Sequence, residues 1–237
     1  MNEPLWDEAT FVEKLREVGA GSYHDRHPFH LLMNEGRLSP EAIRCWVANR
    51  FYYQIHIPIK DAAILSNCPL RDVRREWIAR IIEHDGTEGD EGGIEAWLRL
   101  GQACGMARAD LLDGGQVAPA VRFAVDAYVT FARARPWPVA IASSLTELFA
   151  PDLMAKRLEA FKQFYPWVQP WGFDYFNRRL TQARKDSESA LRLTLAYCNT
   201  PELQRAAVQA LVFKCEVLWA ILDGIAGECG RNPIPDP

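Results

Sequence analysis

Cationic side chains recur inside stretches of this sequence that are otherwise apolar. Between Ala207 and Leu222 the only polar residues are Gln209, Lys214 and Glu216, so a helix formed here should be buried on every side. Glu216 lies two positions from Lys214 and would point elsewhere on a helix. A buried ammonium at Lys214 therefore needs an anionic partner from another element or from a ligand. The alternative is a lysine at a solvated edge, whose long stem reaches water.

A second polar stripe follows residues 50 to 61. Arg50, Gln54, Ile57 and Asp61 are spaced by four, three and four, which places them on one face of a helix. Pro58 cannot donate a hydrogen bond to the Gln54 carbonyl, so a kink is expected beside the stripe. A solvated helix face would explain the stripe alone, whereas a kink next to it favours a site.

Two further pairs of polar residues lie four positions apart. Arg80 with His84, and Tyr175 with Arg179, would project side by side from a helix. Each pair alone is more typical of a charged surface. Together with the two cations above, however, they suit a substrate with several carboxylates, because the arginine fork binds a carboxylate through two hydrogen bonds.

Histidines are the residues most suited to proton transfer or metal binding. His84, in the stretch IIEHDGTEGDEGG, could be a metal ligand, a catalytic group or only a helix end. His24, His27 and His30 recur every three residues, but that spacing turns by about 60° per step on a helix, so three imidazoles would not converge on one metal. The Glu-x-x-His pairs of di-iron helical proteins and the motifs of hydrolases and nucleotide-binding proteins are absent.

The elements that must position these residues are helices. Apolar residues recur at spacings of three and four, without the two-residue alternation of strands. Residues 39–41 (SPE) and 200–202 (TPE) each supply a capping hydroxyl, a first-turn proline and a favourable carboxylate. Glycine and proline breaks predict about eight to ten helices in one all-α domain over residues 1–237, with residues 228–237 as a frayed tail.

Composition narrows the class of protein. With 237 residues, 49% hydrophobic and 24% charged, the chain has enough apolar residues for one domain with a sizeable core. A net charge of -4 offers no general attraction to nucleic acid or to an anionic membrane surface. No run approaches the roughly 18 apolar residues of a membrane span, so a cytoplasmic protein is expected. The six cysteines form no CxxC pair, which favours reduced thiols.

Several long blocks resemble the PqqC family, the pyrroloquinoline quinone (PQQ) synthases. They read HPFH, WVANRFYYQ, KDAAI, HDGTEGDEGGIEAWLRLG, VRFAVDAY, SSLTELFAP, YPW, YFNRRL and FKCEVLW, and extend from His27 to Trp219. The resemblance implies a compact haem-oxygenase-like or TenA-like bundle that works as a cytoplasmic homodimer. It also implies the last step of PQQ biosynthesis, in which molecular oxygen drives ring closure and oxidation of the tricarboxylated intermediate AHQQ. Hydrogen peroxide is released, and no metal or organic cofactor takes part.

The same resemblance implies roles for individual residues. His84 would accept and later return a proton, Arg179 would oppose negative charge on reduced oxygen, and Tyr175 would donate a hydrogen bond or proton. His27 and His30 would be structural. The residues that it assigns to substrate binding are Tyr23, His24, Arg50, Gln54, Arg80, Tyr128, Thr146, Glu147, Arg157 and Lys214.

One position departs from the family pattern. The family usually reads FAPxIHxxR, with a histidine in the pocket, whereas this chain reads FAPDLMAKR and has Met154 there. A thioether cannot transfer a proton and accepts hydrogen bonds only weakly. The proton pathway, rather than substrate binding, is the part of the activity that this change concerns.

Three other functions remain open on the sequence alone. A TenA-like thiamine-salvage hydrolase on the same fold would need a nucleophilic cysteine with an activating partner. A haem-binding oxygenase would use His24 as an axial ligand. A non-catalytic PQQ carrier would bind the quinone without converting AHQQ.

Overall fold

The computed structural model describes residues 4–229, apart from the side chains of Thr181, Ala183 and Arg184. Within this range eleven α-helices and three short 3-10 helices form, and there is no β-strand. The elements are α1 (Glu8–Ser22), η1 (His24–Arg26), α2 (Pro28–Asn34), α3 (Pro40–Asn67), α4 (Arg71–Asp85), α5 (Gly92–Ala103), α6 (Arg108–Asp113), α7 (Pro119–Ala134), α8 (Trp137–Ala142), η2 (Ser143–Phe149), α9 (Ala150–Phe164), η3 (Pro170–Phe173), α10 (Asp174–Tyr197) and α11 (Pro201–Cys229).

The two predicted helix starts are confirmed. The Ser39 hydroxyl accepts a hydrogen bond from the backbone N–H of Ala42 at the start of α3. The Thr200 hydroxyl does the same for Leu203 at the start of α11. The eleven α-helices in this range are one more than the upper end of the predicted eight to ten, and two of them, α6 and α8, are only six residues long.

The two longest helices, α3 and α11, carry much of the site. Helix α3 runs without interruption from residue 40 to residue 67, with Pro58 in its interior. Helix α11 continues to Cys229, which is buried. Residues 228 and 229 are thus helical, and the prediction that they belong to a frayed tail is wrong. The rest of that predicted tail, residues 230–237, lies outside the described residues.

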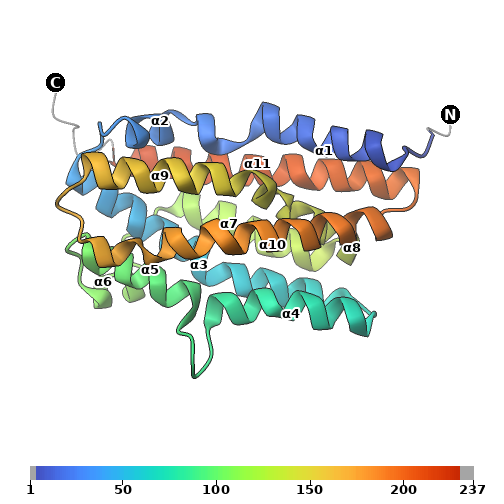
Figure 1. Cartoon of the computed structure of the whole chain (residues 1–237), viewed down its shortest axis with the longest axis horizontal. Coiled ribbons are helices and arrows are strands. Elements are labelled where there is room, and N and C mark those ends of the chain that lie inside the picture. The colour runs from blue at the N-terminus through green and yellow to red at the C-terminus, as the bar shows by residue number, and fades with distance from the viewer. Residues whose placement is uncertain (1–3, 230–237) are drawn as a thin grey trace.

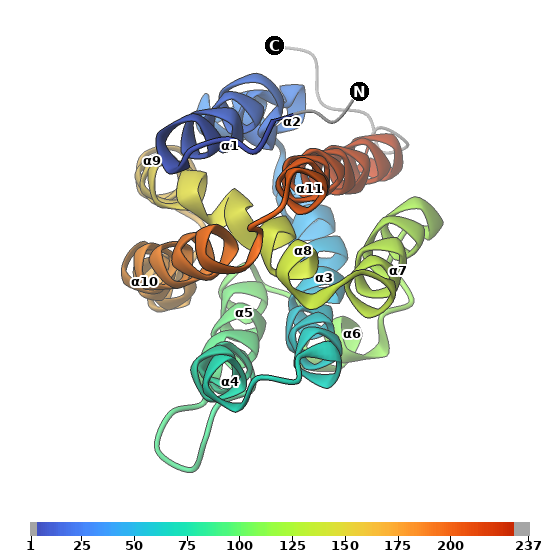
Figure 2. The same ribbon diagram turned by 90° about the vertical axis from the view of Figure 1, so that its right-hand side faces the viewer.

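The long helices run roughly side by side, with both described ends of the chain on the same side of the bundle as α1 (Figure 1). Seen end on, α8 lies among α1, α3, α7, α9, α10 and α11 (Figure 2). Residues 138 to 146, from α8 into η2, are buried. The chain segment at the centre of the bundle therefore includes η2, and the polar residues of η2 face the interior rather than water.

No helix in the described part of the chain combines the length and apolarity that crossing a membrane would require. All six cysteines are free thiols, and five of them are buried. Two clusters of buried apolar side chains make up the core of the described residues.

Candidate active site

A small polar chamber of about 60 Å³ lies inside the bundle, between η1, α3, α7, η2, α9, α10 and α11. Nine of the thirteen predicted site residues line this chamber, although they come from distant parts of the sequence. The nine are Tyr23, His24, Arg50, Tyr128, Thr146, Glu147, Tyr175, Arg179 and Lys214.

The other four predicted residues are buried but do not line the chamber. Arg80 and His84 belong to α4, Arg157 to α9 and Gln54 to α3. Gln54 is 1% exposed, and neither atom of its side-chain amide has a hydrogen-bond partner among the described residues. Since α3 carries both Gln54 and wall residues of the chamber, the polar stripe of this helix faces inward. The alternative of a solvated stripe is therefore wrong.

A buried ion network joins Arg80 and Arg179. Arg80 contacts Glu147 at 2.5 Å, Asp186 at 3.5 Å and Asp61 at 3.6 Å. Arg179 contacts Asp186 at 3.3 Å and Glu147 at 3.6 Å. Burial alone would raise the pKa of Glu147, but the two guanidinium groups hold it well below its ordinary value. Burial dominates at Asp186 and raises its pKa to about 6. Both arginines are thus already neutralised by the protein.

Lys60 also lines the chamber, although it is not among the predicted site residues. Its side chain is 2% exposed, and its Nζ donates to Asp61 Oδ1 at 2.6 Å and to Ser144 Oγ at 3.0 Å. The indole N–H of Trp77 also donates to Asp61. Lys60 opens the block KDAAI and directly precedes Asp61 of the inward stripe, which is the signal that could have identified it. Asp186 has no such signal, because it lies in the hydrophilic stretch QARKDSES.

Lys214 is buried without a carboxylate partner. It is 1% exposed, and its Nζ donates to the Tyr53 hydroxyl at 2.7 Å. The same nitrogen lies 3.6 Å from the centre of the Tyr128 ring. Burial, followed by repulsion from Arg50, lowers the pKa of Lys214 well below its ordinary value. The alternative that this lysine reaches water at a solvated edge is wrong, and the anionic partner that it needs must come from elsewhere.

Arg50 and Arg157 share this lack of a carboxylate. No acidic side chain among residues 4–229 that the structure describes lies within 4.0 Å of the charged group of Arg50, Arg157 or Lys214. Arg50 lies over the Tyr53 ring, with 4.0 Å between its Cζ atom and the ring centre. Burial and then Arg50 lower the pKa of Arg157 to about 10. These three cations form an electropositive region that an anion would stabilise.

His30 supports Arg157, which explains one of the two histidines predicted to be structural. The Nδ1 atom of His30 bonds to the His24 carbonyl at 2.9 Å and must therefore carry the proton. Its Nε2 is then free to accept a hydrogen bond from Arg157 Nη2 at 2.8 Å. His27 turns away toward Asp223 and caps α2. The three imidazoles do not converge, and Nδ1 of the chamber residue His24 has no partner among the described residues.

His84 is set up as a neutral proton acceptor. Its Nδ1 bonds to the Arg80 carbonyl at 2.9 Å, so Nδ1 carries the hydrogen and Nε2 keeps its lone pair. Burial and then the charge of Arg179 lower the pKa of His84 to about 4. Gly86 ends α4 two residues later with a φ of 87°, so His84 is in the last turn but is 4% exposed. No group of three or more His, Cys, Asp or Glu side chains in the described chain is arranged to hold a metal ion.

Solved structures of other proteins have a similar fold. A domain of unknown function with a heme oxygenase-like fold from Shewanella denitrificans OS217 superposes with a TM-score of 0.80 at 14% identity, covering 97% of this chain and 96% of that one. A TenA homolog from Pseudomonas syringae pv. tomato DC3000 superposes with a TM-score of 0.74 at 15% identity, covering 95% and 97%. The predicted all-α, haem-oxygenase-like bundle is confirmed.

Comparison of sequences is more specific. A pyrroloquinoline-quinone synthase of Pseudomonas aeruginosa LESB58 is 54% identical over 235 residues, which cover 98% of this chain and 94% of the relative. One from Cronobacter sakazakii is also 54% identical, over 91% of this chain and 85% of the relative. The sequence profile of the TENA/THI-4/PQQC family matches residues 12–224. The chain that builds this cation-lined chamber belongs to the TENA/THI-4/PQQC family.

Proposed function

We propose that this protein is a pyrroloquinoline-quinone synthase, which uses molecular oxygen to close a ring in AHQQ and oxidise it to PQQ. Relatives that are 54% identical over nearly the whole chain carry that name. The observation that carries the proposal is the group of three buried or half-buried cations, Arg50, Arg157 and Lys214, without carboxylate partners in the described structure. AHQQ is a tricarboxylate, and its anionic groups would supply what these cations lack.

In this proposal the protein positions the substrate, moves protons and stabilises charge. A substrate that forms a stabilised carbanion passes electrons to oxygen itself, and each pair of electrons with two protons reduces one oxygen molecule to hydrogen peroxide. His84 is neutral at pH 7 because its pKa is about 4, so its Nε2 can take a proton from the substrate. Arg179 stays charged and opposes negative charge that develops on oxygen, which is most effective where water is excluded.

The hydrolase alternative has less support from the site. None of the six cysteines lines the chamber. Cys215 is the cysteine nearest in sequence to a chamber residue, because it directly follows Lys214. Burial raises the pKa of the Cys215 thiol to about 11. A thiol with such a pKa is protonated at pH 7 and is a weak nucleophile. We further propose that the synthase acts as a cytoplasmic homodimer without a metal or an organic cofactor, as the family resemblance implies.

Incubation of the pure, metal-stripped protein with AHQQ under air tests the proposal. PQQ absorbance should rise, hydrogen peroxide should accumulate, and both should stop when oxygen is removed. Binding of PQQ without conversion of AHQQ would instead identify a carrier. Release of hydroxymethylpyrimidine from a thiamine analogue would identify a hydrolase, and a Soret band on haem titration would identify a haem protein.

A further inference from the structure

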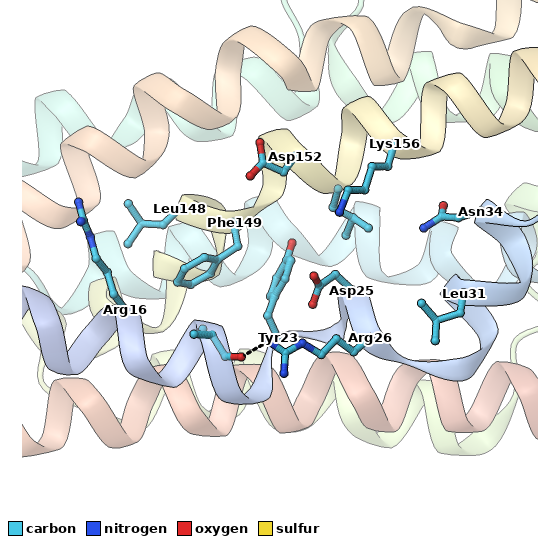
Figure 3. A pocket seen from close by; sticks show the side chains of 13 residues that line it. Arg16, Tyr23, Asp25, Arg26, Leu31, Asn34, Leu148, Phe149, Asp152 and Lys156 are labelled. Atoms are coloured by element: carbon cyan, nitrogen blue, oxygen red, sulfur yellow. Dashed lines mark hydrogen bonds between the residues drawn. The ribbon is translucent and has the colours of Figure 1, made fainter.

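A larger cavity opens next to the chamber, and we call it the outer cleft. It lies between residues 16–34 of the α1–α2 region and residues 148–156, from the end of η2 into the start of α9, and its volume is about 680 Å³ (Figure 3). The chamber itself measures about 60 Å³. Pockets that hold ligands of this size class are roughly 300 to 1,000 Å³. A three-ring tricarboxylate therefore fits the outer cleft but needs the chamber to expand.

The two cavities share a wall, which consists of Tyr23 and the segment from residue 144 to residue 156. Tyr23 lines both cavities. The segment from residue 144 to residue 156 alternates between them: Thr146, Ala150 and Met154 face the chamber, whereas Phe149 and Lys156 face the cleft. A ligand in the outer cleft is thus separated from the cationic chamber by side chains of this wall, and no further layer of structure intervenes.

Two aromatic side chains, Tyr23 and Phe149, belong to this wall. The centres of the Tyr23 and Phe149 rings are 5.4 Å apart, and Figure 3 shows the two side chains next to each other. The Phe149 ring packs directly on the backbone of α1 at Gly19, where an added Cβ would come within 1.9 Å of the ring.

The outer cleft carries cations that the rest of the structure does not neutralise. Arg16 and Lys156 line it, and no carboxylate of the described residues forms an ion pair with either of them. Arg26 also lines it and donates to the Ala20 carbonyl at 2.5 Å. Asp25 and Asp152 oppose them, which leaves three cations against two carboxylates. This local excess of positive charge occurs in a chain whose net charge is -4, so it would concentrate an anion at one place on the surface.

We propose that the outer cleft is the binding vestibule through which a polycarboxylate reaches the chamber, passing between Tyr23 and Phe149. Arg16 and Lys156 attract the carboxylates, and the aromatic pair separates the vestibule from the chamber. This inference rests on the proposed function, because it takes AHQQ or PQQ as the polycarboxylate.

Stopped-flow binding of PQQ tests the role of the charges. Arg16→Ala combined with Lys156→Ala should lower the association rate constant roughly tenfold at low ionic strength and change the dissociation rate constant much less. The difference from wild type should shrink as salt is added. Lys162→Ala is the matched control, because Lys162 is an exposed lysine on the same helix that does not line the cleft.

A second pair of variants tests the aromatic wall. Phe149→Ala should raise the association and dissociation rate constants together, severalfold, and leave the affinity nearly unchanged. Gly19→Ala should act in the same direction, because the added methyl group displaces the Phe149 ring, while alanine favours the α1 helix more than glycine does. A rate change in Gly19→Ala therefore cannot be ascribed to a weakened helix.

The outcomes separate this inference from the proposed function. If the association rate constants of all these variants equal that of wild type, the proposal that the outer cleft is a binding vestibule is wrong. An effect of the charge variants on dissociation alone would overturn it too, because the cleft would then be part of the final binding site. If wild type does not bind PQQ at all, the proposed function fails. Benzene-1,2,4-tricarboxylate then serves as the probe, and an association rate that does not depend on Arg16 and Lys156 overturns the vestibule on its own.

Discussion

Two buried lysines in the same chamber differ in what surrounds them. Lys60 is 2.6 Å from Asp61, whereas among the described residues Lys214 contacts the Tyr53 hydroxyl and aromatic rings but no carboxylate. Removing one partner of a buried ion pair leaves the other charge uncompensated, which typically costs about 3 to 5 kcal/mol. Removing an unpaired buried charge relieves its desolvation instead. The two residues have the same type and similar burial, but only Lys60 has a carboxylate partner among the described residues. We therefore expect their contributions to the free energy of unfolding to differ in sign.

Replacement by methionine, which keeps the length of the side chain, tests this contrast. Lys60→Met should lower the free energy of unfolding, by less than the full ~3 to 5 kcal/mol of an unpaired buried charge because Arg80 and Trp77 still contact Asp61. Lys214→Met should raise it or leave it unchanged. Lys214→Met should also weaken PQQ binding by about 2 to 5 kcal/mol, because a ligand carboxylate loses its buried partner. Urea unfolding and titration calorimetry measure the two effects. Equal destabilisation by both variants would mean that Lys214 has an anionic partner in the free protein.

His84 should matter for chemistry rather than for binding. With Nδ1 donating to the Arg80 carbonyl, only Nε2 can take a proton, and the group is uncharged at pH 7 because its pKa is about 4. His84→Ala should keep PQQ affinity within a few-fold and slow oxidation of AHQQ by about a hundredfold. Single-turnover absorbance measures the rate. An unchanged rate would remove His84 from the proposed role.

Met154 lines the chamber at the position where the family usually has histidine. A thioether cannot carry a proton, so in this chain proton transfer must rely on other groups. Met154→His should therefore retain PQQ formation and add a titrating group to the chamber wall. A single-turnover assay across pH 6 to 8 measures this. Loss of product in the variant would show that the methionine is required for the geometry of this site.

At the scale of elements, Asp186 connects α10 to α4 through Arg80. Burial raises the pKa of Asp186 from 3.8 to about 6. The folded protein therefore holds this proton more tightly than the unfolded chain does, and the group lowers stability as pH rises from about 4 to about 6. His84 has the opposite shift, from 6.5 to about 4, so its effect opposes that of Asp186 in the same range.

Asp186→Asn isolates the contribution of the carboxyl group. Asparagine cannot ionise, so the difference in unfolding free energy between variant and wild type should grow in favour of the variant between pH 4 and pH 7. The expected growth is on the order of 2 to 3 kcal/mol. Urea unfolding at several pH values measures it, and the subtraction cancels the titration of His84. A difference that shrinks with pH would mean that Arg80 and Arg179 outweigh the effect of burial.

The features that were predicted best from the sequence are those that depend on residues close together along the chain. The caps at Ser39 and Thr200 and the all-helical periodicity are local features, and both are found. The inward direction of the Arg50–Asp61 stripe could only be suspected, because a solvated face has the same spacing. Asp186 was missed because its partners are long-range: nothing near it in sequence indicates that α10 brings it to Arg80. The division into neutralised and unpaired cations likewise depends on which carboxylates the fold brings close.

At the scale of the molecule, the free protein keeps cations unpaired in a chamber that only the folded chain can build. A ligand that binds the folded state alone adds RT ln(1 + [L]/Kd) to the unfolding free energy, or about 2.7 kcal/mol at a ligand concentration of one hundred times Kd. In a domain of this size, 1 kcal/mol shifts the melting temperature by roughly 2 to 4 °C. PQQ at that concentration should therefore raise the melting temperature by roughly 5 to 10 °C.

Scanning calorimetry at fixed protein concentration measures this shift, and Lys214→Met provides the control that identifies its source. At the same PQQ concentration the variant should show a smaller shift than wild type, because its affinity is lower while its free form is at least as stable. An equal shift in both proteins would place the ligand outside the chamber. Added salt should reduce this shift in melting temperature less than it reduces the association rate constant of PQQ, since buried charge pairs are screened less than the exposed charges of the outer cleft.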